Sequence, residues 1–125
     1  MNLEEYKDLI ENKPIHIATV TKDNKPNLAV AADVRIIESD KIIVSVNEMV
    51  NTQENVKRNP NVVITVFNDE WVGLRIFGKA KYYESGKYYD FCNKTFFGND
   101  ENASFDAKKP KGALVITIDK IEEFK

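Results

Sequence analysis

Short runs of apolar and β-branched residues, separated by polar turns, recur along the chain. Alternating or continuous apolar runs of this length, with turn residues between them, are typical of strands. The spacing predicts a mainly β protein with short helices, in which six strands form an antiparallel barrel or sandwich. The six predicted strands are IHIATVT (15–21), NLAVAADVRII (27–37), KIIVSV (41–46), NVVITVF (61–67), WVGLRIFGKAKYYE (71–84) and ALVITI (113–118).

Three other segments have apolar residues at helical spacing, and their flanking residues predict where they begin and end. Asn2 is expected to cap the first helix, Asn51 or Thr52 the second and Ser85 the third. Gly98 is expected to end the third helix. The predicted helices are residues 2–12, 52–59 and the segment after Ser85, and residues 119–125 (DKIEEFK) are expected to form a charged tail.

Length and composition narrow the class of protein. A chain of 125 residues and 14.3 kDa predicts a single domain, residues 1–125. The net charge of -2 argues against a dedicated nucleic-acid binder. The first residues are amphipathic and acidic, and they lack the features of a signal peptide. No apolar run approaches the length of a membrane-spanning helix, and the single cysteine fits a reducing compartment. We therefore expect a cytoplasmic protein that binds no membrane.

The side chains that usually carry chemistry are scarce. His16 is the only histidine and lies within a predicted strand, and Cys92 lies on the apolar stripe of the third helix. Metal sites need clustered ligands, and nucleophilic triads need a histidine placed by a partner, so we expect neither. The chain also lacks the glycine-rich phosphate and dinucleotide motifs and the nucleophile elbow. Any reaction would therefore depend on a bound cofactor.

The stretch NEMVNTQENVKRNPNVVI (47–64) begins with a polar segment that Asn59-Pro60 closes off before the next apolar strand, and this segment has two interpretations. It can be a plain strand–helix–strand connection. It can also bind a phosphate, because the first N–H groups of a helix lack partners and carry partial positive charge. Thr52 would add a hydroxyl, and Asn51 and Asn55 would add amide donors.

The whole chain resembles the split-barrel flavoproteins, the superfamily of FMN-binding and pyridoxamine 5'-phosphate oxidase-like proteins. The resemblance is greatest to the small bacterial FMN-binding proteins. It implies a six-stranded Greek-key split barrel in which two subunits form a homodimer with FMN at the interface. The motifs that carry it are IATVTKDNKPNLAV, DKIIVSVNEMVNTQENVKRNPNVVITV, IFGKAKYY and KGALVITIDKIEEF.

The resemblance also implies a cofactor-binding set. Asn51, Thr52 and Asn55 would hold the phosphate of FMN. Trp71 would either pack at the end of its strand or cover the ring of the cofactor in the partner subunit. Small residues on the second strand would let the flat ring lie close to the backbone, and Asp33 would accept a hydrogen bond from the flavin N3–H or disfavour the anionic reduced flavin. The residues expected along the ring and its approach are Ala31, Ala32, Asp33, Val46, Asn47, Glu48, Met49 and Val50.

The chain departs from the family pattern in two respects. Many relatives have lysine or arginine where this chain has Asn51. The phosphate would therefore be bound by the helix N-terminus, or by Arg35 or Arg75. The other basic residues considered, Lys57, Arg58 and the lysines at 108–111, are expected in solvent. The arginine–histidine segment of true pyridoxamine-phosphate oxidases is missing, and vitamin B6 oxidation is not expected.

The leading hypothesis is therefore an FMN-dependent oxidoreductase or electron carrier. The alternatives are the same fold binding the deazaflavin F420, a barrel that binds single-stranded nucleic acid, and a dimer without a cofactor.

Overall fold

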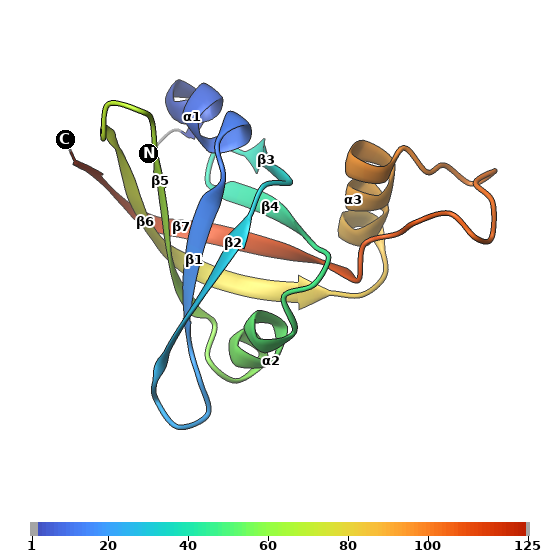
Figure 1. The fold of residues 1–125 in the computed structure, drawn as a ribbon, viewed down its shortest axis with the longest axis horizontal. Coiled ribbons are helices and arrows are strands. Elements are labelled where there is room, and N and C mark those ends of the chain that lie inside the picture. The colour runs from blue at the N-terminus through green and yellow to red at the C-terminus, as the bar shows by residue number, and fades with distance from the viewer. Residues whose placement is uncertain (1–2, 125) are drawn as a thin grey trace.

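The structure is a computed structural model that describes residues 3–124. Its four helical segments and seven strands follow the predicted positions closely over most of the chain (Figure 1). The helices are the 3-10 helix η1 (Leu3–Tyr6), α1 (Lys7–Asn12), α2 (Val50–Arg58) and α3 (Lys87–Phe97). The strands are β1 (Ile15–Val20), β2 (Pro26–Ala31), β3 (Val34–Glu38), β4 (Lys41–Val46), β5 (Asn61–Phe67), β6 (Gly73–Tyr83) and β7 (Gly112–Phe124).

All seven strands form one antiparallel sheet in the order β2-β1-β5-β6-β7-β4-β3. The prediction of six strands is wrong, because the run 27–37 is two strands separated by Ala32 and Asp33. The first half pairs with β1 and the second with β4, so the chain must leave one edge of the sheet and join the other. Strands β4 to β7 follow a Greek-key order. The barrel is not closed: β2 contacts β4, but no ladder joins the two edges.

The longest ladder joins β6 and β7, and it corrects the predicted charged tail. Residues 119–124 continue β7, and their charges pair across the ladder, with Nζ of Lys79 3.0 Å from Oδ2 of Asp119. The register of this ladder shifts between Phe77 and Gly78. A Cβ at Gly78 would lie 2.5 Å from the Thr117 carbonyl oxygen, so only glycine allows the two backbones to approach this closely.

The core lies inside the bent sheet and is closed by helices. Inward residues of the strands pack with Leu3 of η1, Ile10 of α1 and Val56 of α2. A second, smaller cluster lies on the outer side of β4 and β7, where α3 covers Ile43. Cys92 belongs to this cluster and is fully buried, in keeping with its predicted position on the apolar stripe of the third helix. Burial, reinforced by the charge of Asp33, raises the pKa of the Cys92 thiol to about 12.

The helix boundaries differ from the predicted caps. The N-cap residues are Met49 for α2 and Gly86 for α3, and neither helix has a side-chain cap, so the caps predicted at Asn51 or Thr52 and at Ser85 are wrong. The cap predicted at Asn2 lies outside the described residues. Gly98 adopts the left-handed conformation at the end of α3, as predicted (φ 69°).

Glu11 ties α1 to β3 and makes the fold sensitive to acid. Its Oε2 accepts the Ile36 N–H at 2.9 Å, and its Oε1 lies 3.0 Å from Nζ of Lys7. Burial is the strongest influence and opposes ionisation, but the Ile36 N–H, Lys7 and Arg35 together outweigh it and lower the pKa of Glu11. Because this pKa is depressed in the folded state, the carboxylate stabilises the fold above its unfolded pKa, and this contribution is lost as the pH falls.

We therefore expect Glu11→Gln to lower the free energy of unfolding by about 1 kcal/mol at neutral pH. The difference from the wild type should begin to shrink as the pH falls through about 4, where the unfolded carboxyl binds its proton, and should close at lower pH, where the folded carboxyl is protonated as well. Urea unfolding of both proteins at pH 7 and at acid pH measures this. A difference of constant size at both pH values would show that the carboxylate charge does not contribute.

Candidate functional site

The turn between β4 and α2 presents polar side chains at one end of the sheet. Asn47, Glu48 and Asn51 are exposed, and Val50 is half exposed at the first helical position. Met49 packs partly against the main core and holds the turn in place. The turn itself is stabilised by the Val50 N–H, which donates to the Glu48 carbonyl at 3.0 Å.

Thr52 has an unusual environment in the first turn of α2. Only 1% of the residue is exposed, and its hydroxyl is buried without a hydrogen-bond partner among residues 3–124. Within the same residues the N–H groups of Asn51 and Thr52 make no hydrogen bond to a preceding carbonyl. A buried hydroxyl without a partner costs free energy and needs an explanation. The first turn of α2 therefore holds several donors that are free to bind an anion.

Asn55 lies on the same helical face as Thr52, one turn further along, but its amide is already engaged. Its Nδ2 donates to the Thr19 hydroxyl at 3.0 Å, and its Oδ1 accepts from Nη2 of Arg58 at 2.9 Å. Asn55 is 4% exposed and Thr19 is 2% exposed. The bond thus fixes α2 to β1. Arg58 is exposed, as predicted, and its guanidinium also contacts the helix.

A second polar network joins Asp33 to the end of β4. Nδ2 of Asn47 donates to the Asp33 carboxylate at 3.2 Å, and the Ser45 hydroxyl donates to Oδ1 of Asn47 at 2.9 Å. The Ser45 N–H also donates to the Asp33 carbonyl at 2.9 Å. The structure therefore brings Asp33 and Asn47 together, at the break between β2 and β3.

The remaining predicted residues divide into core and surface. Ala31 and Val46 belong to the main core, so their side chains face inward and only their backbone is available at the site. Ala32 is exposed between β2 and β3. Its small side chain leaves the backbone at this break open to a flat group.

Trp71 is not beside the other predicted residues within one subunit. It lies in the β5–β6 turn, at the opposite end of β5 from α2 (Figure 1). It is 68% exposed and has a φ of 63°, a left-handed conformation that is uncommon and costly for a bulky residue. Its ring stacks on Phe67, with ring centroids 5.0 Å apart. The structure thus holds a large aromatic side chain in solvent at this end of the sheet.

His16 continues this stack on β1. Its ring is parallel to Phe67 within 10°, with centroids 6.1 Å apart, and its Nδ1 is buried without a partner among residues 3–124. In the same described residues, no group of three or more His, Cys, Asp or Glu side chains could hold a metal ion. None of the helices described there is long and apolar enough to cross a bilayer.

The two arginines considered for the phosphate both have other contacts. The Arg35 guanidinium lies over the Phe96 ring and donates to the Val34 carbonyl at 2.9 Å. Nη1 of Arg75 lies 3.1 Å from Oε1 of Glu122 on the outer side of the β6–β7 ladder. Neither arginine has a contact that directs it to the first turn of α2.

Sequence reasoning missed two residues that hold the site together, Thr19 and Ser45. Each is 2% exposed and each hydrogen bonds a predicted site residue. The signal for Thr19 is visible in IHIATV, where its hydroxyl occupies an inward position of the alternating strand. Ser45 gives no such signal, because β4 is buried on both faces.

The fold is an open antiparallel barrel, and the polar first turn of α2 lies at one end of its sheet. Comparison with known families shows which proteins share this arrangement. The family model of pyridoxamine 5'-phosphate oxidase matches residues 3–125, and the chain belongs to this family. An uncharacterized protein of Methanocaldococcus jannaschii is 32% identical over 124 residues, covering 98% of this chain and 80% of that protein.

Two solved structures have the same fold over nearly the whole chain. HupZ of Group A Streptococcus is 27% identical with a TM-score of 0.84, covering 98% of this chain and 94% of that chain. An FMN-binding protein from Syntrophomonas wolfei subsp. wolfei is 25% identical with a TM-score of 0.79, covering 98% of this chain and 86% of that chain. The expected resemblance to the split-barrel flavoprotein superfamily is thereby confirmed.

Proposed function

We propose that the protein binds FMN noncovalently, with the phosphate at the first turn of α2, and functions as a flavin-dependent oxidoreductase or electron carrier. The observation that carries the proposal is the Thr52 hydroxyl, which is buried in that turn without a partner among the described residues. A bound phosphate supplies the missing acceptor and also suits the adjacent N–H groups. The FMN-binding protein of Syntrophomonas wolfei, similar over 98% of this chain, supports the choice of cofactor.

The groups at the helix start suit a phosphate of FMN. The Thr52 hydroxyl and the N–H groups of Asn51 and Thr52 donate to its oxygens, and the exposed Asn51 amide adds a further donor. The N-terminal end of the helix dipole favours the negative charge. In this proposal Asn55 positions the helix through Thr19 rather than touching the phosphate, because both ends of its amide are engaged.

The residues at the β2–β3 break would hold the ring. Ala32 leaves the backbone open, and the Asp33 carboxylate, kept in place by Asn47, is an acceptor for a ring N–H. When bound, FMN supplies hydride or electron transfer, for which the side chains of the protein alone are poorly suited. The contribution of the protein is to bind and orient the cofactor and to exclude water from one side of it.

A titration of the apo-protein with FMN tests the proposal. We expect flavin fluorescence to change until one FMN is bound per chain, with riboflavin at least about tenfold weaker because it lacks the phosphate. F420 is titrated alongside as the alternative cofactor. Equal affinity for FMN and riboflavin would show that the phosphate is not bound at this turn. A resident cofactor should bind below about 100 μM, so the absence of FMN binding at that concentration would overturn the proposal.

A further inference from the structure

A hollow of about 570 Å³ lies beside β6, where the last turn of α2 comes close to the outer side of β7 and β4. The charged side chains that line it are all lysines, and no carboxylate of residues 3–124 lines it. We call it the lysine hollow. The residues that define it are Lys41, Lys57, Lys79, Lys81, Tyr83 and Tyr88.

The hollow exists because β6 extends beyond the start of β5. Strand β5 begins at Asn61, which pairs with Lys79, so the following residues of β6 have no strand beside them on that edge. The chain between α2 and β5 lies there instead, and the Ala80 N–H donates to the Pro60 carbonyl at 2.8 Å. Lys57, in the last turn of α2, therefore lines the same hollow as the outward residues of β6.

Three of the lysines lie on the same side of adjacent strands. Lys41 of β4 pairs with Thr117 of β7, and Thr117 pairs with Lys79 of β6. Lys81 follows Lys79 on the same side of β6, because side chains two residues apart share a face. Neighbouring strands are about 4.8 Å apart and alternate residues about 7 Å apart, so these lysines extend over roughly 10 Å by 7 Å. Gathering them on one phosphate would crowd like charges, whereas two or three linked phosphates match their spread.

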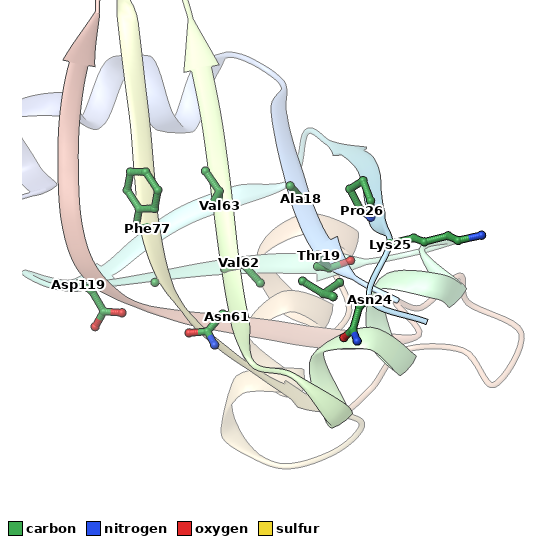
Figure 2. A pocket seen from close by; sticks show the side chains of 12 residues that line it. Ala18, Thr19, Asn24, Lys25, Pro26, Asn61, Val62, Val63, Phe77 and Asp119 are labelled. Carbon is green, nitrogen blue, oxygen red and sulfur yellow. The ribbon is translucent and has the colours of Figure 1, made fainter. Parts of the chain in front are cut away.

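The carboxylates near two of these lysines bind them only weakly. Nζ of Lys79 lies 3.0 Å from Asp119, whose side chain lines a separate hollow with Phe77 (Figure 2). Nζ of Lys41 lies 3.4 Å from Asp40. Both pairs are open to solvent, and ion pairs of this kind contribute little in water. A ligand with several negative charges can therefore replace them.

Lys81 has the fewest competing contacts of the four lysines. Among residues 3–124 it makes no ion pair, and its Nζ lies 5.6 Å from the centre of the Tyr83 ring. Lys57 is less available, since its Nζ lies 3.6 Å from Glu84 and 3.8 Å from Glu54. We therefore expect Lys81 to contribute most to the binding of an anion.

Tyrosine side chains form the wall of the hollow beyond Lys81. Tyr83 is the next outward residue of β6, and its ring packs against the Tyr88 ring of α3, with centroids 4.9 Å apart. Both tyrosines are half-buried, so they are held in place and still present surface to the hollow. The lysines thus lead along β6 to an aromatic surface that a flat ring can contact.

We propose that the lysine hollow binds a nucleoside di- or triphosphate, with the phosphates on the lysines and the base against the tyrosines. Lysine ammonium groups bind phosphate as point charges, and the Thr117 hydroxyl adds a donor between the strands. The site is separate from the one proposed for FMN, because Lys57 is in the last turn of α2 and Thr52 is in the first. The proposal does not depend on the protein binding a flavin.

Calorimetric titration of the FMN-free protein with AMP, ADP and ATP, in magnesium-free buffer of low salt, tests the ligand class. We expect one ATP per chain and an affinity that rises with each phosphate, so that ATP binds at least about tenfold more tightly than AMP. Equal affinity for AMP and ATP would overturn the proposal. The absence of ATP binding at about 1 mM would also overturn it.

Two variants of equal net charge test the position of the site. Lys81→Gln should weaken ATP binding about tenfold, because a charge-assisted hydrogen bond to phosphate is lost. Lys22→Gln is the matched control, since Lys22 is exposed in the β1–β2 turn and does not line the hollow, and its ATP affinity should stay within about twofold of the wild type. Equal losses in both variants would show nonspecific attraction and overturn the site.

A third variant separates this site from the first turn of α2. Thr52→Val should leave ATP affinity unchanged, because Thr52 does not line the lysine hollow. If Thr52→Val weakens ATP binding as much as Lys81→Gln, the nucleotide phosphates bind at the first turn of α2 and the proposal is overturned. ATP binding that depends on Lys81 in a protein that binds no FMN would remove the proposed function and leave the nucleotide site intact.

Discussion

Replacing Thr52 by valine is expected to weaken FMN binding about tenfold and to leave the apo-protein as stable as the wild type or up to ~1 kcal/mol more stable. The hydroxyl would be lost as a donor to a charged phosphate, which is among the stronger hydrogen bonds. In the apo-protein the same hydroxyl is buried without a partner among residues 3–124, and valine removes that desolvation cost. FMN titration and urea unfolding of the apo-protein measure the two effects.

Thr52→Ser is the matched control for this prediction. Serine keeps the hydroxyl and loses a buried methyl group, so we expect FMN affinity within about threefold of the wild type and a stability loss of ~1 kcal/mol. Valine should thus lower the FMN affinity without lowering the stability, and serine should lower the stability with little change in the affinity. If valine destabilises the apo-protein and leaves FMN affinity unchanged, the hydroxyl is structural and the phosphate is held elsewhere.

Gly78→Ala is expected to lower the free energy of unfolding by about 2–3 kcal/mol, at the upper end of the usual cost of overpacking. An added Cβ would lie 2.5 Å from the Thr117 carbonyl oxygen and 3.0 Å from Cγ2 of Ile116. The first of these is backbone, in the middle of the longest ladder, so the strands must separate to make room. Urea unfolding gives the change in free energy.

Gly98→Ala provides the comparison for Gly78. Gly98 has a left-handed φ of 69°, and a Cβ there would meet nothing within 4 Å. Its cost should therefore be conformational only, about 1 kcal/mol. If Gly78→Ala proves no more costly than Gly98→Ala, the register shift at Gly78 has enough freedom to accept a side chain.

Local patterns predicted most elements because burial and secondary structure are linked over a few residues. IHIATV, KIIVSV and NVVITVF are strands within one residue of their predicted bounds. The failures occurred where a distant segment decides the outcome. The break at Ala32 and Asp33 depends on β2 and β3 pairing at opposite edges of the sheet. The charged end of β7 becomes a strand because β6 provides partners such as Arg75 for Glu122.

The candidate site shows the same division. The helix after β4 follows from the spacing of its apolar residues, although its N-cap is Met49 rather than Asn51 or Thr52. The family resemblance assigned this segment to a phosphate. The sequence could not indicate that Asn55 would bind Thr19, 36 positions away. It also could not separate Ala31 and Val46, which face the core, from the exposed Ala32.

The sequence by itself determined the strands and helices, the family, and the lack of histidine and cysteine clusters for unaided chemistry. Only the tertiary structure decided the strand order, the burial of the Thr52 hydroxyl without a partner among residues 3–124, and the position of Trp71 at the far end of the sheet. The physical reason is the distance along the chain over which each interaction acts. Side-chain alternation is set by neighbours two residues apart, whereas the partners of a strand and the cover over its outer side come from segments tens of residues away.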